Sequence, residues 1–347
     1  MITFSFHGTS HGEGYSGVIS GLPDGFTFNI DEVNKQLYER KHGLGRSARQ
    51  AFPDVVIFDG FDKKVTVNGE LHFFVANKSV EVRPDITALR SGHSDVVGRA
   101  RHPELTVREI AELTSARNSV CYVVLGAICK QLLTARGIYT YHYVEKIGGI
   151  SSRNRYRYGI SEQDPHFATL HCPCRYATGL MVEAIDKARN EGNSLGGMVA
   201  VGATGIPMGL GEILPYTERL DAQIAANLVG IPSVKGISFG MGDKYAQLDG
   251  VTAHDKLTFN NDEIVYTTNN CGGIVSGLTT GGDILCHLTV KPVPTVQNVQ
   301  TIDSVTQNTV PQHYERADVC VVPNVGVIAE NILAYVILNQ ILKQEEN

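Results

Sequence analysis

Residues 106–136 carry the longest helical pattern in the chain and read TVREIAELTSARNSVCYVVLGAICKQLLTAR. In the second half, apolar residues such as Val120, Val124 and Ile128 recur with the helical period, and Gly137 follows as a stop signal. The middle turns are apolar nearly all round, which is typical of a buried helix. We therefore predict one long helix over residues 106–136, in the interior of the molecule.

Two further helices are predicted later in the chain. They cover residues 175–189 and 325–342, where apolar residues again recur with the helical period. Helices are too few and too far apart for a regular alternation with parallel strands. No low-complexity linker divides the 347 residues, and 42% of them are hydrophobic, which is enough for a large core. We expect one mixed α+β domain over residues 1–347, with central helices covered by sheets.

Short β-branched runs bounded by glycines predict strands that end in tight turns. They lie at residues 16–25, 196–209 and 272–277. A helix with an acidic first turn follows each of the first two runs, at residues 31–37 and 220–228. An internal pseudo-repeat of strand and helix is one interpretation, and chance similarity of glycine-rich strand ends is the other.

Charge and hydropathy exclude several classes of protein. The chain has 30 Lys plus Arg against 36 Asp plus Glu, a net charge of -6, which argues against nucleic-acid binding. No apolar run reaches the roughly 18 residues of a membrane-spanning helix. The N-terminus has neither the basic start nor the apolar stretch of a signal peptide. We therefore expect a cytoplasmic protein with no membrane partner.

The seven cysteines are expected to be reduced core residues rather than a disulfide framework. Their number is odd, and several lie inside apolar runs. His171, Cys172 and Cys174, with His166 nearby, have a spacing that resembles half of a zinc site. Because no second paired cluster follows, we predict an ordinary loop and no metal.

Basic residues gather in two segments of this acidic protein. Arg40, Lys41, Arg46 and Arg49 lie within ten residues that contain no acid. The second group consists of Arg83, Arg90, Arg99, Arg101 and Arg108, with His93 and His102 among them. Local positive charge favours a small polyanionic ligand, because the arginine fork fits phosphate and carboxylate. The alternative is a solvated basic face.

Two histidines lie in glycine-containing turns where a ligand has access to them. His11 is flanked by Gly8 and Gly12, and His93 lies in the segment RSGHSD at residues 90–95. Each can carry a proton near neutral pH, although either one alone is also compatible with an ordinary loop histidine. Neither a dinucleotide fingerprint, a P-loop nor a nucleophile elbow is found.

Seven segments, in this order, resemble the signatures of the chorismate synthase family and span nearly the whole chain. They are FHGTSHGEGYSGVISGLPDG, RSGHSD, TSARNS, EGNSLGGMVAVGATGIPMGLGE, LDAQIAANLVGIPSVKGISFGMG, NNCGGIVSGLTTGGDILCHLTVKPVPT and RADVCVVPNVGVIAENILAYVIL. The resemblance implies a layered sandwich of antiparallel β-sheets around central helices, and a homotetramer.

The resemblance also implies a carbon–oxygen lyase of the shikimate pathway, which leads to the aromatic amino acids. In that reaction 5-enolpyruvylshikimate 3-phosphate loses phosphate and a ring proton by anti 1,4-elimination to give chorismate. Reduced FMN is needed, and NADPH is a possible reductant of the flavin. Two alternatives remain open: a paralogue that binds flavin or a shikimate-like anion without turnover, and a flavin enzyme or lyase acting on a related cyclic phosphate.

The resemblance further implies roles for individual residues. His93 matches the histidine near the leaving phosphate, His11 the histidine near the flavin, and Asp318 the aspartate that helps the flavin take the substrate proton. The substrate-binding residues would be Arg40, Arg46, Arg90, Arg117 and Arg316. The FMN-binding residues would be Ser115, Thr252, Ala253, Ser276, Lys291, Pro292, Val293, Pro294, Thr295 and Arg316. Arg46 and Arg49 fall in a region that the family uses near a nicotinamide cofactor.

Four positions depart from the family pattern. Leu113 and Asn324 stand where the family has arginines, Ser91 replaces a proline, and Ala317 replaces a histidine. The change at Leu113 removes a basic group expected near FMN. Loss of one charged partner of a phosphate costs roughly 1.5 to 3 kcal/mol. FMN affinity is therefore the property that these departures affect most.

Overall fold

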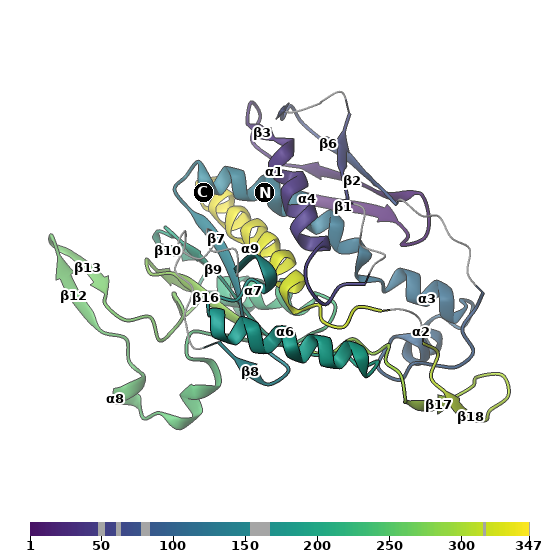
Figure 1. The fold of residues 1–347 in the computed structure, drawn as a ribbon. Helices are drawn as coiled ribbons and strands as arrows, with labels where there is room; N and C mark the ends of the chain where they lie inside the picture. Colours follow the sequence, from purple (N-terminus) through teal and green to yellow (C-terminus); the bar gives the residue numbers. More distant parts are fainter. Residues whose placement is uncertain (48–52, 60–63, 78–83, 153–166, 315–316, 347) are drawn as a thin grey trace.

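The computed structural model describes residues 1–47, 53–59, 64–77, 84–152, 167–314 and 317–346. Its centre is a layer of packed helices, of which α4 (Ser119–Thr134) and α9 (Val322–Glu345) lie against each other over most of their length. Two more helices, α1 (Ile30–Lys41) and α7 (Leu220–Val229), also pack on α9. The predicted interior position of the apolar half of residues 106–136 is confirmed, because α4 is largely buried (Figure 1).

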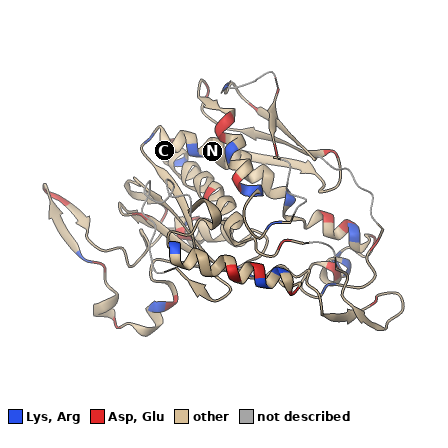
Figure 2. Cartoon of the chain, in the orientation of Figure 1, with Lys and Arg blue, Asp and Glu red and all other residues tan. Residues whose placement is uncertain are grey.

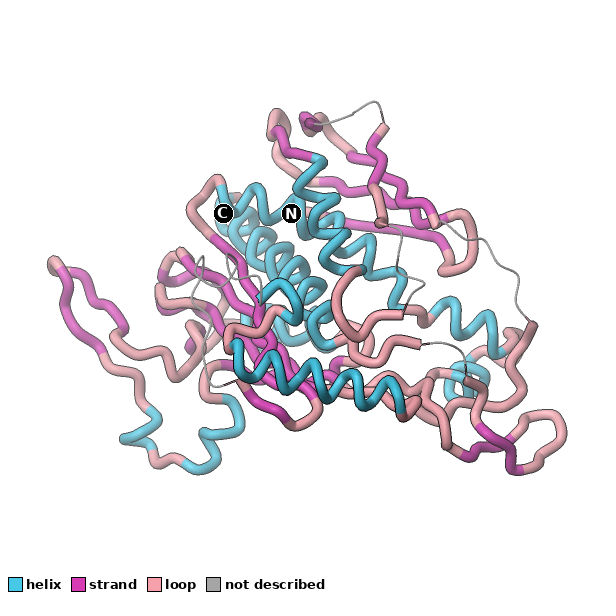
Figure 3. Tube along the Cα trace, viewed as in Figure 1, coloured by secondary structure: helices cyan, strands magenta, loops and turns pink. Residues whose placement is uncertain are grey.

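An antiparallel sheet covers one side of the helical layer. Its strands follow the order β1-β2-β6-β4. Their bounds are Thr3–Gly8 for β1, Gly14–Ser20 for β2, Leu71–Ala76 for β6 and Val56–Phe58 for β4. Beside it β3 (Thr27–Asn29) pairs with β5 (Lys64–Thr66). Strand β2 contacts α4 and strand β4 contacts α1, so this sheet closes the layer from above in Figure 3.

A five-stranded antiparallel sheet covers the other side, in the order β11-β16-β9-β7-β8. The bounds are Val234–Phe239 for β11, Ile284–Val290 for β16, Gly197–Thr204 for β9, Tyr139–Ile147 for β7 and Ile150–Ser151 for β8. Helix α9 packs on β7 and β9, while α6 (Arg175–Asn190) lies outside the sheet against β8. Helices enclosed by two antiparallel sheets form the layered α+β sandwich that was predicted.

Smaller elements extend from the sandwich. A three-stranded sheet joins β10 (Met208–Gly211), β15 (Leu278–Thr280) and β14 (Ile274–Val275). An arm made of η4 (Gly242–Gln247), α8 (Gly250–Ala253), β12 (Leu257–Asn260) and β13 (Glu263–Tyr266) reaches away from the body (Figure 1). On the opposite side of the body lie α2 (Asp95–Arg101), α3 (Val107–Leu113) and the hairpin of β17 (Gln300–Ile302) and β18 (Thr309–Pro311). A short 3-10 helix, η3 (Tyr216–Glu218), precedes α7.

The predicted single helix over residues 106–136 is wrong, because the chain turns in its middle. Helix α3 ends at Leu113, a short 3-10 turn η2 covers Ala116–Asn118, and α4 starts at Ser119. Ser115 is extended, and its hydroxyl accepts a hydrogen bond from the Arg117 amide. A serine that caps a new turn satisfies backbone donors that a continuous helix would have bonded itself.

The other helix predictions differ from the structure only at the ends. Helix α9 alone among the described helices is long and apolar enough to cross a bilayer, and most of it is buried in the protein. The search for an uninterrupted apolar run of about 18 residues did not find this helix, because Asn324, Glu330 and Asn331 interrupt it. In both halves of the proposed pseudo-repeat a strand precedes a helix, β2 before α1 and β9 before α7. A duplication stays a prediction.

The cysteine prediction is confirmed. All seven are thiols outside any disulfide bond, and each is buried except Cys271, which is half-buried. In the described part of the chain no group of three His, Cys, Asp or Glu side chains is arranged to hold a metal. His166 lies outside the described residues. Cys172 and Cys174 pack into the core instead.

Candidate active site

A pocket of about 630 Å³ lies where the C-terminal end of α1, the start of α9, the turns around α2 and α3, and the end of β16 meet. Its lining contains nine basic or imidazole side chains, namely Arg40, Arg46, Arg90, Arg108, Arg117, Lys235, Lys291, His11 and His93. Among the residues that the structure describes, two acids, Glu112 and Asp318, line it with them. We call this the cationic pocket. Both signs of charge occur along α1 and around α2 and α3, whereas the strands are mostly uncharged (Figure 2).

Both predicted basic segments contribute to the cationic pocket, although not with every member. The first provides Arg40 and Arg46, while Lys41 is not in the lining and Arg49 lies outside the described residues. The second provides Arg90, Arg108 and His93. The residues of that group that do not line it are Arg99, Arg101 and His102, and Arg83 is not described.

A buried carboxylate, Asp54, holds three cations at one wall of the cationic pocket. Arg40 donates to its Oδ2 at 2.9 Å, Lys41 to its Oδ1 at 3.0 Å, and Arg117 donates a short hydrogen bond to Oδ2. Burial opposes ionisation of Asp54, but Arg40 and Arg117 outweigh it and lower its pKa to about 2. The pKa of the Arg40 guanidinium falls to about 10, mainly through burial, so both groups stay charged at neutral pH.

His93 and Arg90 share a second buried carboxylate. Asp95 accepts hydrogen bonds from Nε and Nη2 of Arg90, at 2.8 and 2.9 Å, and it lies 2.9 Å from Nδ1 of His93. The turn that carries His93 packs tightly, because a Cβ atom at Gly92 would come within 2.7 Å of Pro294. Lys291 donates to the carbonyl of Gly92 at 2.7 Å. These contacts bring Lys291, Pro294 and His93 to one end of the pocket.

His11 is held less tightly than His93, whereas Asp318 has two close partners. Nδ1 of His11 lies 3.3 Å from a carboxylate oxygen of Glu112, and both side chains are about a quarter exposed. Asp318 forms an ion pair with Arg46 at 2.8 Å and accepts a hydrogen bond from the Ser47 amide at 2.7 Å. The predicted catalytic aspartate is thus partnered by a predicted substrate-binding arginine.

The predicted FMN-binding residues divide into two sets. Ser115, Lys291, Val293, Pro294 and Thr295 line the cationic pocket. Pro292 lies between two of these positions without lining the pocket itself. Thr252 and Ala253 lie on α8 of the arm, and Ser276 lies in the turn between β14 and β15, so these three do not line the pocket within one chain. Arg316 lies outside the described residues.

Residues present in the cationic pocket fit a group that carries a phosphate. Lys235 and Lys291 are close enough that Lys235 contributes to lowering the Lys291 pKa, after the larger effect of burial. Nε of Arg40 and Oδ1 of Asn324 are buried in the lining, and neither has a hydrogen-bond partner among the described residues. Excess cations and orphaned polar atoms fit an anionic cofactor or substrate rather than a dry core.

Two of the departures have visible structural consequences. Asn324 donates to the carbonyls of His42 and Glu39, at 2.8 and 3.4 Å, and so ties the start of α9 to the end of α1. Leu113 is 59% exposed at the end of α3, and the residues on each side of it line the pocket while it does not. An arginine there would have a long enough side chain to reach the rim.

Sequence reasoning missed Asp54, Glu112 and Lys235. Nothing local in the sequence marks Asp54, because its partners come from two other segments, the end of α1 and the turn η2. Lys235 lies inside a segment that resembles the family, LDAQIAANLVGIPSVKGISFGMG, but was not singled out. Its position beside Lys291 follows from the pairing of β11 with β16.

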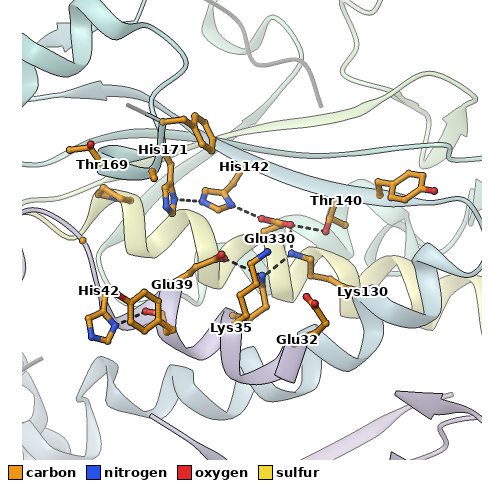
Figure 4. Close-up of a pocket in the computed structure, with 18 of the residues that line it drawn as sticks. Glu32, Lys35, Glu39, His42, Lys130, Thr140, His142, Thr169, His171 and Glu330 are labelled. Atoms are coloured by element: carbon orange, nitrogen blue, oxygen red, sulfur yellow. Dashed lines mark hydrogen bonds and ion pairs between the residues drawn. The ribbon is translucent and has the colours of Figure 1, made fainter. Parts of the chain in front are cut away.

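A second pocket of about 1000 Å³ opens on the other side of α1 (Figure 4). A chain of hydrogen bonds crosses its floor: Gln36 donates to Glu39, Lys130 donates to Gln36 and to Glu330, and Glu330 also accepts from His142. His142 in turn lies 2.6 Å from His171, nitrogen to nitrogen. Burial opposes the charge on Glu330, yet Lys130 and His142 hold its pKa far below the ordinary value.

Comparison with known proteins identifies the family. The model of the family described as chorismate synthase matches residues 2–342. The chorismate synthase of Moorella thermoacetica is 32% identical over 99% of this chain and 94% of that protein. The chorismate synthase of Syntrophotalea carbinolica is 33% identical over 94% of this chain and 89% of that protein.

A solved structure supports the same architecture. A crystal structure described as chorismate synthase superposes with a TM-score of 0.78, at 24% identity, over 99% of this chain and 92% of that one. It establishes the α+β sandwich, while the family match and the relatives establish kinship by sequence. The chain belongs to the chorismate synthase family, whose members are lyases.

Proposed function

We propose that this chain converts 5-enolpyruvylshikimate 3-phosphate into chorismate and phosphate by an anti 1,4-elimination that requires reduced FMN. One observation supports the proposal most: His11, His93, Asp318 and seven Arg or Lys side chains line a single pocket of about 630 Å³. The substrate carries a phosphate and two carboxylates. A pocket with this excess of fixed cations would compensate that charge in a site that excludes much of the water.

The leaving phosphate is proposed to lie at the end formed by His93, Arg90 and Lys291. Departure of phosphate concentrates negative charge on one oxygen. Donors fixed near that oxygen bind the transition state more strongly than the ground state, and only such differential binding accelerates the reaction. Arg117 and Arg46, which also line the pocket, would bind the carboxylates.

FMN is proposed to bind beside this substrate. Ser115, Lys291 and Thr295 of the cationic pocket would hold it, with Arg316 as a further candidate. Reduced FMN would supply the electron-rich ring that assists loss of phosphate and the nitrogen that receives the ring proton. Asp318, which lines the pocket, would help to transfer that proton. His11 would hold a proton near the flavin.

The remaining features of the proposal concern the whole protein. The family match over residues 2–342 supports one chorismate synthase-like domain over residues 1–347. We propose a cytoplasmic homotetramer with no nucleic-acid or membrane partner. The arm supports an assembly, because apolar side chains such as Val251 and Phe259 are exposed on it. NADPH could reduce the flavin near Arg46 and Arg49, but we expect an external source of reduced flavin.

The test is anaerobic turnover of 5-enolpyruvylshikimate 3-phosphate with chemically reduced FMN. We expect equimolar release of phosphate and rise of chorismate absorbance, both dependent on the flavin. A folded protein that binds reduced FMN and substrate but forms neither product would refute the lyase proposal and favour a binding paralogue. If the protein turns over only a related cyclic phosphate, the proposed substrate is wrong, while the proposed reaction class, a lyase, stands.

A further inference from the structure

We infer that Asp95 is a positioning residue, which fixes the imidazole of His93 and the guanidinium of Arg90 so that both face the cationic pocket. The inference rests on the proposed function, since it assigns a partner to the histidine beside the leaving phosphate. Nothing in the sequence resemblance gives Asp95 a role.

The carboxylate of Asp95 is fully used. It is 0% exposed and is the first residue of α2. Oδ2 accepts hydrogen bonds from the backbone amide and Nε of Arg90, at 2.9 and 2.8 Å. Oδ1 accepts one from Nη2 of Arg90 at 2.9 Å and faces Nδ1 of His93 at 2.9 Å. One buried group therefore orients two side chains of the pocket.

Asp95 is ionised in this environment. Burial by itself raises the pKa of a carboxyl group, but the hydrogen bonds from His93 and Arg90 outweigh burial and hold the Asp95 pKa well below its ordinary value. An ionised carboxylate is only an acceptor. Nδ1 of His93 must then carry a hydrogen, which leaves Nε2 as the nitrogen that faces a ligand.

The surroundings of His93 make this arrangement stiff. Gly92 packs against Pro294, and Lys291 holds the carbonyl of Gly92. Ser94 lies 3.1 Å from the same Nδ1, but its hydroxyl is also 2.6 Å from that of Thr114. Among the acids that the structure describes, only Asp95 is within ion-pair distance of His93. A charged acceptor at 2.9 Å competes better for the single Nδ1 hydrogen than a neutral hydroxyl.

The chemical consequence is control of the atom that meets the phosphate. A carboxylate behind an imidazole selects the tautomer, holds the ring plane and stabilises the imidazolium form. Protonated His93 would otherwise share one end of the pocket with Arg90 and Lys291 and no nearby counter-charge. The His11 pair differs, because Glu112 is 3.3 Å away and partly exposed.

The first test is a double-mutant cycle on the enzyme with reduced FMN. Asp95→Asn should lower kcat about 10- to 100-fold, as loss of a group that orients a functional histidine does. It should also raise KM, because asparagine keeps only one acceptor oxygen and Arg90 loses part of its hydrogen bonding to residue 95. In a His93→Ala background the same substitution should lower kcat by a clearly smaller factor, because only the effect through Arg90 remains. An equal loss of kcat with and without His93 would overturn the inference.

A matched control is available in the same region. His102 and Glu104 also form a histidine–carboxylate pair two residues apart, at 3.2 Å, but the pair is exposed and outside the cationic pocket. Glu104→Gln should leave kcat and KM unchanged. A loss of kcat there equal to that of Asp95→Asn would show that both changes act through local stability and would overturn the role of Asp95.

The second test needs no variant of Asp95 and no activity. In ¹⁵N-histidine-labelled wild-type protein, the His93 signal, assigned with His93→Gln, should be that of a ring with hydrogen on Nδ1. A neutral ring with hydrogen only on Nε2 would overturn the inference. If wild-type protein shows the expected signal but releases no phosphate, the proposed function fails while the position of Asp95 behind His93 stands.

Discussion

The cationic pocket and the second pocket share the walls α1 and α9 but use their charges in opposite ways. In the second pocket the buried Glu330 forms ion pairs with Lys130 and His142, and His142 lies within hydrogen-bond distance of His171 (Figure 4). In the cationic pocket the acids Asp54 and Asp95 are buried behind the basic groups that they hold, and the basic groups line the cavity.

This difference teaches that pairing, rather than the number of ionisable residues, decides what a pocket can bind. Opposite charges that pair with one another inside a pocket stabilise the elements that carry them. Charges backed by buried acids stay oriented toward the cavity and keep a net positive field there. The end of α1 illustrates both cases, since Arg40 lines the cationic pocket and its neighbour Glu39 lines the second one.

The largest expected effect is a loss of turnover that occurs on substitution in the cationic pocket and not in the second pocket. His93→Ala and His11→Ala should each lower turnover about 10²- to 10⁴-fold, as loss of a proton-transfer group does, without unfolding the protein. His42→Ala is the matched control, because His42 lines the second pocket and stacks on Tyr38. Steady-state kinetics and circular dichroism measure both. Near wild-type turnover in both first variants would contradict their assigned roles.

The next effect compares the two buried carboxylates. Asp54→Asn and Glu330→Gln should each cost about 3–5 kcal/mol of unfolding free energy, because each leaves buried cations without a counter-charge. Only Asp54→Asn should also raise KM, since Arg40 and Arg117 lose their common partner. Urea unfolding and kinetics on the folded fraction measure the two quantities. A KM rise in Glu330→Gln would show that the pockets are coupled.

A smaller effect concerns pH and the second pocket. Burial and, after it, the nearby His142 lower the pKa of His171 from 6.5 to about 3. The unfolded chain therefore binds a proton at His171 that the folded chain does not, so stability is present above pH 6.5 and falls as the pH drops below it. The slope is about 1.4 kcal/mol per pH unit for one proton.

His171→Asn tests this slope. Asparagine tolerates the left-handed backbone at this position, where φ is 53°. We expect the variant to be less stable at pH 7 but to lose less further stability between pH 6.5 and 5 than the wild type. Urea titrations at several pH values give both slopes. Parallel slopes would contradict a neutral buried His171.

The smallest effect sharpens the cationic pocket itself. Leu113→Arg restores the basic group of the family at an exposed position beside the rim. It should tighten FMN binding, by up to about tenfold, if that group pairs with the cofactor phosphate. Tyr176→Arg on α6, also exposed and outside the pocket, is the control. Calorimetry with FMN measures both, and equal affinities in all three proteins would place the missing arginine away from the phosphate.

Sequence periodicity predicted the helices whose apolar pattern can be seen within a single segment of the chain. Helices α6 and α9 and the helical half at α4 follow from apolar residues at helical spacing. The break before α4 was not predicted, because Thr114 and Ser115 are tolerated within a helix and act as cap only where the chain turns. The spacing of the helices led us to expect sheets over central helices, whereas the antiparallel, layered arrangement of those sheets followed from the family resemblance.

Many of the site residues that the family motifs implied lie together in the fold, while their roles stay predictions. His11, His93, Asp318, Arg40, Arg46, Arg90 and Arg117 all line the cationic pocket. Thr252, Ala253 and Ser276 do not line it within a single chain. Motif order specifies residue types and not distances, so residues on the arm could not be placed from the sequence.

The sequence by itself determined the chemical inventory of this protein: an apolar central layer, local clusters of arginine and glycine-flanked histidines. Only the tertiary structure decided which charges meet. Asp54 and Arg117 are 63 residues apart, and His142 and Glu330 are 188 apart, yet each pair is in contact. Electrostatic energy depends on separation in space and on burial, and folding sets both.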